Sequence, residues 1–200
     1  RCRLVGSEMC IRDRAQTDHV AGIAVMSTHY DLIVLGTGGV GSAALYHAAR
    51  RGLRCLGLDR FPPAHDRGSS HGESRLIRQS YFEHADYVPL LQRAYALWDQ
   101  LDPTLLRRTG VIYFGPEGGQ ILEGVLASAR RHRLHVTAIP PHSVPHFTAP
   151  AGCTALLETE AGWLPVEQCV LAHLDQAAAA GAEHRLSLIH ISEPTRRHLI

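Results

Sequence analysis

Three glycines directly after an apolar run are spaced to bind a phosphate group. Gly36, Gly38 and Gly41 form the pattern G-x-G-x-x-G. In this pattern the first glycine permits a tight turn, the second lets the backbone approach a pyrophosphate, and the third lets a helix pack closely on a strand. Unpaired N–H groups at the helix start would face the phosphate, where the helix dipole favours negative charge. We therefore expect this turn, with Gly39 and Val40 inside it, to bind the phosphates of a cofactor.

An acidic residue follows the glycines at the distance expected for a ribose contact. Asp59 ends a second apolar run, Cys55–Leu58, and Arg60 comes next. An acid at such a strand end, about 20 residues past the glycines, binds the hydroxyl pair of a ribose. We expect Asp59 and Arg60 to belong to an adenine dinucleotide site. The pattern does not distinguish NAD from FAD, and a βαβ unit with a purely structural role is the alternative.

A small polar loop supplies further donors after the second strand. The loop, Gly68–Gly72, contains Ser69, Ser70 and His71. Clustered glycine and serine residues break regular structure, and such a loop exposes backbone N–H groups. We expect these three side chains to join the dinucleotide site.

Two arginines behind this loop could bind an anion. A helix is expected from Ser74, which would place Arg75 and Arg78 on one face. Because Leu76 and Ile77 lie between them, the pair could turn toward an anion at the edge of a core. A solvated helix face is an equally good interpretation of the spacing.

A strand, a helix and a second strand must position the glycine turn. Leu32–Leu35 is typical of a buried strand, and Ser42–Arg51 is a helix rich in alanine that Gly52 would end. The second strand is Cys55–Leu58. A right-handed crossover is nearly obligatory for such a connection, so we expect the two strands to be adjacent and parallel. The predicted fold class is α/β.

The order of these motifs resembles that of the monomeric sarcosine oxidase and N-methyltryptophan oxidase family, within the D-amino acid oxidase-like superfamily. The similarity covers about Thr28 to Arg185. It includes the glycine turn, Asp59 and the segment Gly68–Arg78. Further matching segments are Pro62–His65, Tyr87–Leu90, Leu97–Trp98, Thr109–Val111, Phe114–Pro116 and Glu158–Gly162.

The resemblance implies an FAD enzyme that oxidises the C–N bond of a secondary amino acid with oxygen and gives hydrogen peroxide. It implies that Arg78 binds the substrate carboxylate, that Arg75 lies beside the flavin ring and that Tyr81 lines the pocket. A bidentate guanidinium holds a carboxylate in one orientation, so the C–H bond next to the amine can face the flavin. These roles make Arg75, Arg78 and Tyr81 the expected catalytic set.

The resemblance also implies a division of the chain. Residues 26–105 would form the N-terminal part of a Rossmann-like FAD-binding domain, 106–160 the start of a smaller α+β substrate domain, and 161–185 a return to the first domain. The elements expected beyond the arginines are a helix over Asp86–Leu101, a strand over Gly110–Phe114, a helix over Leu122–Arg133, a strand over Leu134–Ile139, a loop over Pro140–Pro150, a strand over Leu156–Glu158 and a helix over Val166–Ala180.

The two ends of the chain have an unusual relation. Leu4–Arg14 and Leu186–Arg196 can be encoded by opposite strands of one DNA sequence, which resembles an adapter used in preparing sequencing libraries. We therefore expect residues 1–25 to be an adapter scar with upstream read-through, and 186–200 a second scar. Residues 1–25 are expected to be disordered and both scars to pack against nothing, with Met26 as the natural start.

Composition excludes several classes of function. The chain has 200 residues and a net charge of +1, which offers no electrostatic basis for nucleic-acid binding. Its apolar runs are too short to span a bilayer. Cys55, Cys153 and Cys169 are an odd number without a C-x-x-C pair, which is typical of reduced, buried thiols in the cytoplasm. We expect a soluble cytoplasmic protein that is monomeric when complete.

Histidines are abundant, but their setting argues against a metal site. His132 and His135 lie among arginines, which repel a cation, and the pair His142 and His146 is interrupted by a proline. No metal is expected.

A second interpretation is a catalytically incomplete, dinucleotide-binding fragment. The covalent flavin link of the family uses a cysteine in the later half of its chains, and Cys55, Cys153 and Cys169 do not match that position. The chain as printed is therefore expected to be inactive alone. Another FAD-dependent amino acid oxidase or dehydrogenase is a further alternative, and an NAD-dependent dehydrogenase is disfavoured by the serine loop and the arginine pair.

Overall fold

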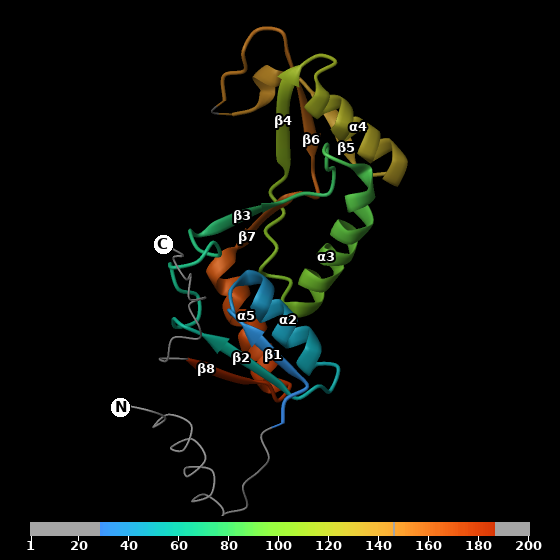
Figure 1. The fold of residues 1–200 in the computed structure, drawn as a ribbon. Coiled ribbons are helices and arrows are strands. Elements are labelled where there is room, and N and C mark those ends of the chain that lie inside the picture. The colour runs from blue at the N-terminus through green and yellow to red at the C-terminus, as the bar shows by residue number, and fades with distance from the viewer. Residues whose placement is uncertain (1–28, 146, 187–200) are drawn as a thin grey trace, which may run out of the picture.

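A computed structural model describes residues 29–145 and 147–186 (Figure 1). A parallel sheet lies at one end of the molecule, with strand order β1-β2-β8. Its strands are β1 (Leu32–Leu35), β2 (Cys55–Asp59) and β8 (Glu183–Leu186). Leu32 pairs with Cys55 and Leu35 with Leu58, in parallel. The predicted adjacency and direction of the first two strands are confirmed.

Helix α2 (Gly39–Ala49) connects β1 to β2, and α5 (Val166–Ala179) lies beside it (Figure 1). Their shared core contains Leu45, Cys55 and Val170, each at most 2% exposed. The opposite side of β1 is open: Ile33 is 51% and Leu35 64% exposed. The expectation that β1 is buried is therefore wrong for one of its two faces, because both helices cover the same side of this strand.

The structure corrects the helix expected from Ser74. Ser74–Ile77 is a strand, β3, which pairs antiparallel with β7 (Gly162–Pro165). The pairing with β7 satisfies the backbone groups that a helix would have bonded internally. Arg75 lies within this strand and Arg78 follows its end, so the two arginines do not share a helix face.

A second sheet forms the other end of the molecule (Figure 1). Its strands are β4 (Val111–Pro116), β6 (Cys153–Glu158) and β5 (Val136–Ile139), in the order β4-β6-β5 and all antiparallel. Helix α4 (Gln120–His132) packs on this sheet, and Val125 is fully buried between them. These elements agree with the strand, helix and strand expected between Gly110 and Ile139.

The remaining helical elements among the described residues are α3 (Val88–Leu101), with a 3-10 helix before it, and a 3-10 turn before β6. A short 3-10 helix, η2 (Ala85–Tyr87), leads into α3, which spans the distance between the two sheets (Figure 1). A second 3-10 turn, η3 (Pro141–Ser143), lies in the proline-rich segment before β6. The helix expected over Asp86–Leu101 is thus present with a 3-10 first turn.

The described ranges include little of the two predicted adapter scars. Residues 1–28 and 187–200, and with them Met26 and Leu188–Ser192, lie outside the described residues. Leu186, the first residue of the second scar, is the last residue of β8 and pairs with Asp59. Within residues 29–145 and 147–186, no helix combines the length and the apolar character needed to cross a bilayer.

Candidate functional site

The glycine turn after β1 has a backbone that side chains would not tolerate. Gly36 has a φ of +83°, and its N–H group donates to the carbonyl of Leu58 at 2.8 Å. A Cβ atom on Gly41 would lie 1.8 Å from the Gly36 carbonyl oxygen. The first and third glycines of the motif are therefore required by the turn and by the packing of α2 on β1.

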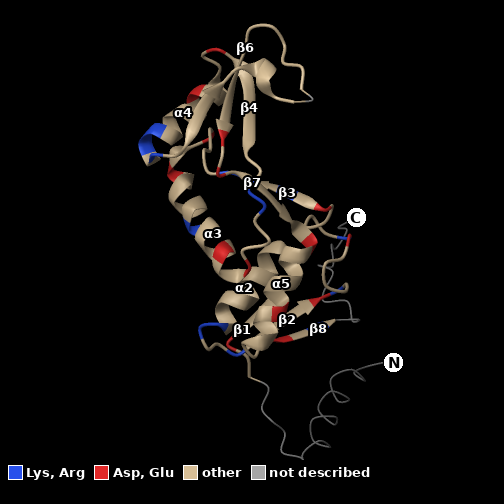
Figure 2. Ribbon diagram, turned by 180° about the vertical axis from the view of Figure 1, so that it is seen from behind, with Lys and Arg blue, Asp and Glu red and all other residues tan. Residues whose placement is uncertain are grey.

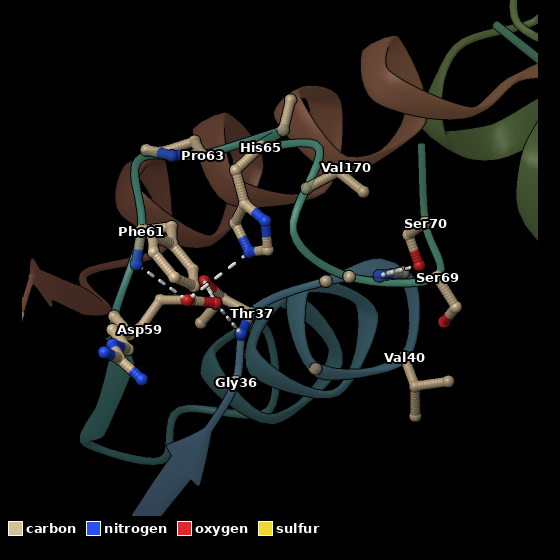
Figure 3. A pocket seen from close by; sticks show the side chains of 16 residues that line it. Gly36, Thr37, Val40, Asp59, Phe61, Pro63, His65, Ser69, Ser70 and Val170 are labelled. Carbon is tan, nitrogen blue, oxygen red and sulfur yellow. Dashed lines mark hydrogen bonds and ion pairs between the residues drawn. The ribbon is translucent and has the colours of Figure 1, made fainter. Parts of the chain in front are cut away.

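The polar loop of residues 68–72 lies over the start of α2 (Figure 3). The hydroxyl of Ser70 accepts a hydrogen bond from the Gly39 N–H group at 3.0 Å. Helix α2 begins after Gly38, whose position provides no side-chain cap, so Ser70 supplies the cap from a different segment. A Cβ atom on Gly38 would make only an ordinary 3.5 Å contact with Ser70 Oγ. The space around the turn therefore does not itself require glycine at position 38.

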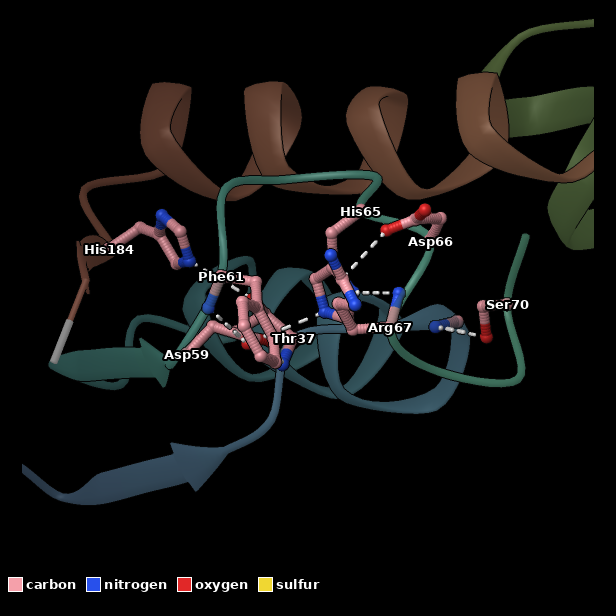
Figure 4. Close-up of polar contacts among 9 residues, drawn as sticks. Thr37, Asp59, Phe61, His65, Asp66, Arg67, Ser70 and His184 are labelled. Carbon is pink, nitrogen blue, oxygen red and sulfur yellow. Dashed lines mark hydrogen bonds and ion pairs between the residues drawn. The ribbon is translucent and has the colours of Figure 1, made fainter. Parts of the chain in front are cut away.

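The Asp59 carboxylate is bonded to the glycine turn (Figure 4). Its Oδ2 accepts from the Thr37 N–H group at 2.6 Å and from Thr37 Oγ1 at 3.1 Å. Its Oδ1 accepts from the Phe61 N–H group at 3.1 Å and lies 3.5 Å from His65 Nε2. Burial acts to raise the pKa of Asp59, but the hydrogen bonds from Thr37 and Phe61 outweigh it and hold the pKa below its usual value.

Three partners of this carboxylate, Thr37, Phe61 and His65, were not among the predicted site residues. Thr37 is 2% exposed, and its hydroxyl also contacts His184 Nε2 of β8 at 3.0 Å. The histidine His65 stacks beside Phe61, with ring centroids 5.0 Å apart. Thr37 stands at the variable position between the first two glycines of the motif. The only sequence signal for its role is a hydroxyl group that can bond the acid after the second strand.

A cavity of about 400 Å³ lies over the turn (Figure 3). It brings together nine of the predicted cofactor residues: Gly36, Gly38, Gly39, Val40, Gly41, Asp59, Arg60, Ser69 and Ser70. Most of the remaining lining of the cavity consists of Phe61, Pro63, Ala64, His65, Gly68 and Val170. Its floor is glycine backbone at the start of a helix, which fits a pyrophosphate, and its acidic end at Asp59 fits a ribose. His71 and Arg75 are not part of this lining.

Arg75 is bonded to the polar loop rather than to the cavity. Its guanidinium donates to the carbonyls of Ser69, His71 and Ser74. From the other side, the Glu167 carboxylate in the first turn of α5 accepts from the Gly72 N–H group at 2.7 Å. The loop that covers the glycine turn is therefore fixed at its carbonyls and at its amides.

Arg78 lies in a separate, partly enclosed position. Its side chain is 16% exposed and pairs with Glu83 Oε1 at 2.9 Å. The guanidinium carbon lies 4.4 Å from the ring centroid of Tyr81 and 5.3 Å from that of Phe82. The structure thus brings the Arg78 guanidinium and the Tyr81 ring together, while Arg75 bonds a different part of the chain. An enclosed guanidinium between aromatic rings can bind a carboxylate more strongly than one in open water.

The described histidines and cysteines do not form a metal centre. Within the described ranges there is no group of three or more histidine, cysteine or acidic side chains suited to a metal ion. Figure 2 shows the arginines near His132 gathered at the end of α4, far from the parallel sheet; His146 lies outside the described residues. Cys55 and Cys169 are buried as expected, but Cys153, the first residue of β6, is only half-buried.

Comparison with known proteins gives one family and consistent relatives. A family model described as FAD dependent oxidoreductase matches residues 31–189. The chain is 40% identical over 180 residues to a monomeric sarcosine oxidase of Streptomyces avermitilis, covering 86% of the chain and 46% of that protein. It is 41% identical over 160 residues to an N-methyl-L-tryptophan oxidase of Yersinia pestis, covering 76% and 43%.

The comparison with solved structures agrees with the fold. NikD, described as an unusual amino acid oxidase essential for nikkomycin biosynthesis, superimposes in its open form with a TM-score of 0.67 and 26% identity. The match covers 78% of this chain and 43% of NikD. The chain therefore spans less than half the length of each of these three relatives.

Proposed function

The chain belongs to the FAD-dependent oxidoreductase family, and we propose that the complete enzyme oxidises the C–N bond of a secondary amino acid with oxygen, giving hydrogen peroxide. The sarcosine and N-methyl-L-tryptophan oxidases among its relatives support this substrate class. The observation that carries the proposal is the Arg78 guanidinium, 16% exposed and enclosed by aromatic rings at the end of β3.

The turn of residues 36–41 would hold the FAD pyrophosphate, with the ribose at Asp59 and Arg60. Bound FAD would supply the acceptor for the two electrons that leave the substrate. Ser70 already bonds the Gly39 amide, so its hydroxyl must share that donor with a phosphate or release it. Ser69 and His71 would add donors from the same loop.

Arg78 would bind the substrate carboxylate. Glu83 is 43% exposed, so a substrate can replace one carboxylate with another while the guanidinium stays paired. The exchange avoids leaving a half-buried charge without a partner. Two parallel hydrogen bonds would then fix the direction of the substrate, and the Tyr81 ring would form a wall of the pocket.

Arg75 is proposed to lie beside the flavin ring. Its strand, β3, runs from the loop over the glycine turn toward Arg78, which supports a place between the cofactor and the substrate. Its bonds to three carbonyls hold its positive charge in one position. A fixed cation there would favour negative charge on a neighbouring ring system.

The 200-residue chain alone is proposed to lack oxidase activity and to bind FAD weakly. The open face of β1, with Ile33 and Leu35 exposed, supports this, since each buried side chain of this type contributes about 1.5 to 3 kcal/mol. We further propose a cytoplasmic monomer for the complete enzyme.

The test uses the full-length protein, purified and examined for visible flavin absorbance. Peroxide release is then measured with sarcosine, with N-methyl-L-tryptophan and with a primary amino acid. Bound flavin and peroxide from a secondary amino acid are the expected result. Bound nicotinamide, or flavin reduction that only an artificial dye and not oxygen reverses, would contradict the proposal.

A further inference from the structure

A buried carboxylate lies where the antiparallel sheet meets the segment that follows Arg78. Glu158, the last residue of β6, is 1% exposed. Its Oε1 accepts from the Gln79 N–H group at 2.6 Å, and its Oε2 accepts from the Ser80 N–H group at 3.2 Å. The Ser80 hydroxyl also donates to Oε2, as does the Tyr113 hydroxyl at 2.8 Å.

This arrangement uses both oxygens of the acid. Burying a carboxylate is costly unless hydrogen bonds compensate for the lost water, and an apolar residue of similar volume often stabilises such a position as well or better. Two successive backbone N–H groups, from Gln79 and Ser80, converge on different oxygens of one side chain. A glutamine could accept from only one of them, because its second terminal atom is a donor.

The segment that Glu158 bonds, residues 79–82, belongs to no strand or helix. Strand β3 ends at Ile77, and the chain is irregular from Arg78 until η2. On its other side the segment meets α4, where the Ser128 hydroxyl donates to the Tyr81 carbonyl. A Cβ atom on Gly124 would lie 2.5 Å from the Phe82 carbonyl oxygen, so that contact is close. The segment is therefore held between β6 and α4.

Tyr113 connects the carboxylate to the guanidinium. Its hydroxyl bonds Glu158, and its ring centroid lies 5.9 Å from the Arg78 guanidinium carbon. Burial raises the pKa of Tyr113, and the Glu158 charge acts in the same direction, so the hydroxyl keeps its proton and remains a donor.

We propose that Glu158 is a positioning residue for the substrate-carboxylate site. It fixes the backbone of residues 79 and 80, and this sets the direction in which Arg78 and Tyr81 project. The inference rests on the proposed function of Arg78. Glu158 itself contacts neither the cavity over the glycine turn nor Glu83, so its effect on a substrate passes through the arginine.

The test is Glu158→Gln in the full-length, FAD-loaded enzyme. Acetate serves as a carboxylate probe, and its dissociation constant is read from the change in flavin absorbance. Acetate affinity is expected to fall about tenfold or more, since one buried N–H group loses its acceptor, while FAD content is unchanged. Ser80→Ala is the matched control: it removes one side-chain donor to Glu158, but both N–H groups keep their acceptors, so the loss should stay below about threefold.

Two further variants keep the test decisive. Ser128→Ala frees the same segment from the α4 side, so it should weaken acetate binding in the same direction even if Glu158→Gln does not fold. In an Arg78→Ala background, Glu158→Gln should cause no additional loss, because the two residues act through one contact. A general loss of stability would not depend on the arginine in this way.

The outcomes separate this inference from the proposed function. If Arg78→Ala weakens acetate binding but neither Glu158→Gln nor Ser128→Ala does, the positioning role is wrong and the proposed function stands. If Glu158→Gln weakens binding further in the Arg78→Ala background, Glu158 does not act through the arginine. If Arg78→Ala leaves acetate affinity unchanged, both the proposed function and this inference fail.

Discussion

The cavity over the glycine turn and the surroundings of Arg78 are built in opposite ways. The first is mostly backbone: glycines line the cavity at the start of α2, and Asp59 bonds the same turn from the end of β2. The second is mostly side chains: Arg78 lies among aromatic rings, and one of them, Tyr113, bonds the Glu158 carboxylate. A site built from backbone tolerates few substitutions at its glycines. A site built from side chains can lose the side chain that binds the ligand while the protein keeps its fold.

The largest effect is expected at the third glycine. Gly41→Ala would place a Cβ atom 1.8 Å from the Gly36 carbonyl oxygen, so β1 and α2 must separate. We expect loss of the folded flavoprotein, measured as soluble yield and flavin content of the full-length enzyme. Gly38→Ala, with a 3.5 Å contact, is the control for folding and should keep its soluble yield. A Gly41→Ala protein with normal flavin content would show that the turn is more plastic than described.

Arg78→Ala should weaken substrate binding by about 2 to 4 kcal/mol, because a charge-assisted pair with the carboxylate is lost. The fold and the flavin should be retained, since Arg78 does not line the cavity over the glycine turn. The measurement is KM for the amine together with flavin content. Lost flavin with unchanged substrate affinity would mean that the roles of Arg75 and Arg78 are exchanged.

An acid-sensitive group lies in the core between α2, α3 and α5, beside Tyr46 and Trp98. His173 of α5 is 6% exposed, next to Trp98 with ring centroids 5.0 Å apart, and burial lowers its pKa to about 4. An ordinary histidine has a pKa of about 6.5. Between about pH 4 and 6.5, His173 is therefore protonated in the unfolded chain and neutral in the folded chain. Its stabilising contribution is complete above about pH 6.5 and falls with pH, by up to about 3 kcal/mol near pH 4.

The variant His173→Gln should flatten this part of the stability curve. The measurement is the free energy of unfolding of the full-length protein between pH 4 and 7. His135→Gln, at an exposed position, is the control and should keep the original slope. Equal slopes in all three proteins would exclude His173 as the source.

Ser70→Ala should have the smallest effect. Removing the hydroxyl leaves the Gly39 N–H group without its cap, which costs about 1 kcal/mol in the cofactor-free protein. Bound FAD should reduce this cost, because a phosphate can accept from the same group. Comparing the change in Tm with and without FAD checks this. An equal or larger loss in the FAD-loaded protein would contradict it.

The sequence predicts the glycine turn well because its determinants are contiguous. The φ of Gly36 and the close contact of Gly41 are consequences of residues within one short segment. The position of Asp59 follows from the length of the crossover. The hydrogen bonds from Thr37 to Asp59 could not be predicted, since the motif does not fix the direction of the Asp59 side chain.

The elements that sequence analysis missed depend on distant partners. Ser74–Ile77 is too short for its period to separate a strand from a first helical turn, and pairing with β7 decides the outcome. Strand β8 carries Glu183, His184 and Arg185, a composition unlike that of a buried parallel strand, and it pairs only with β2 among the described strands. Glu158 meets Gln79 across 79 positions, which no local pattern encodes.

The full-length enzyme is expected to hold two independent ligand sites, FAD in the cavity over the glycine turn and a carboxylate at Arg78. The most direct test measures two dissociation constants, for FAD and for acetate at saturating FAD, in full-length Gly38→Ala and Arg78→Ala. Gly38→Ala should weaken FAD alone, because its Cβ atom would enter the space proposed for the pyrophosphate and would leave Arg78 unchanged. Arg78→Ala should weaken acetate alone. A variant that weakens both ligands equally would contradict the separation of the two sites.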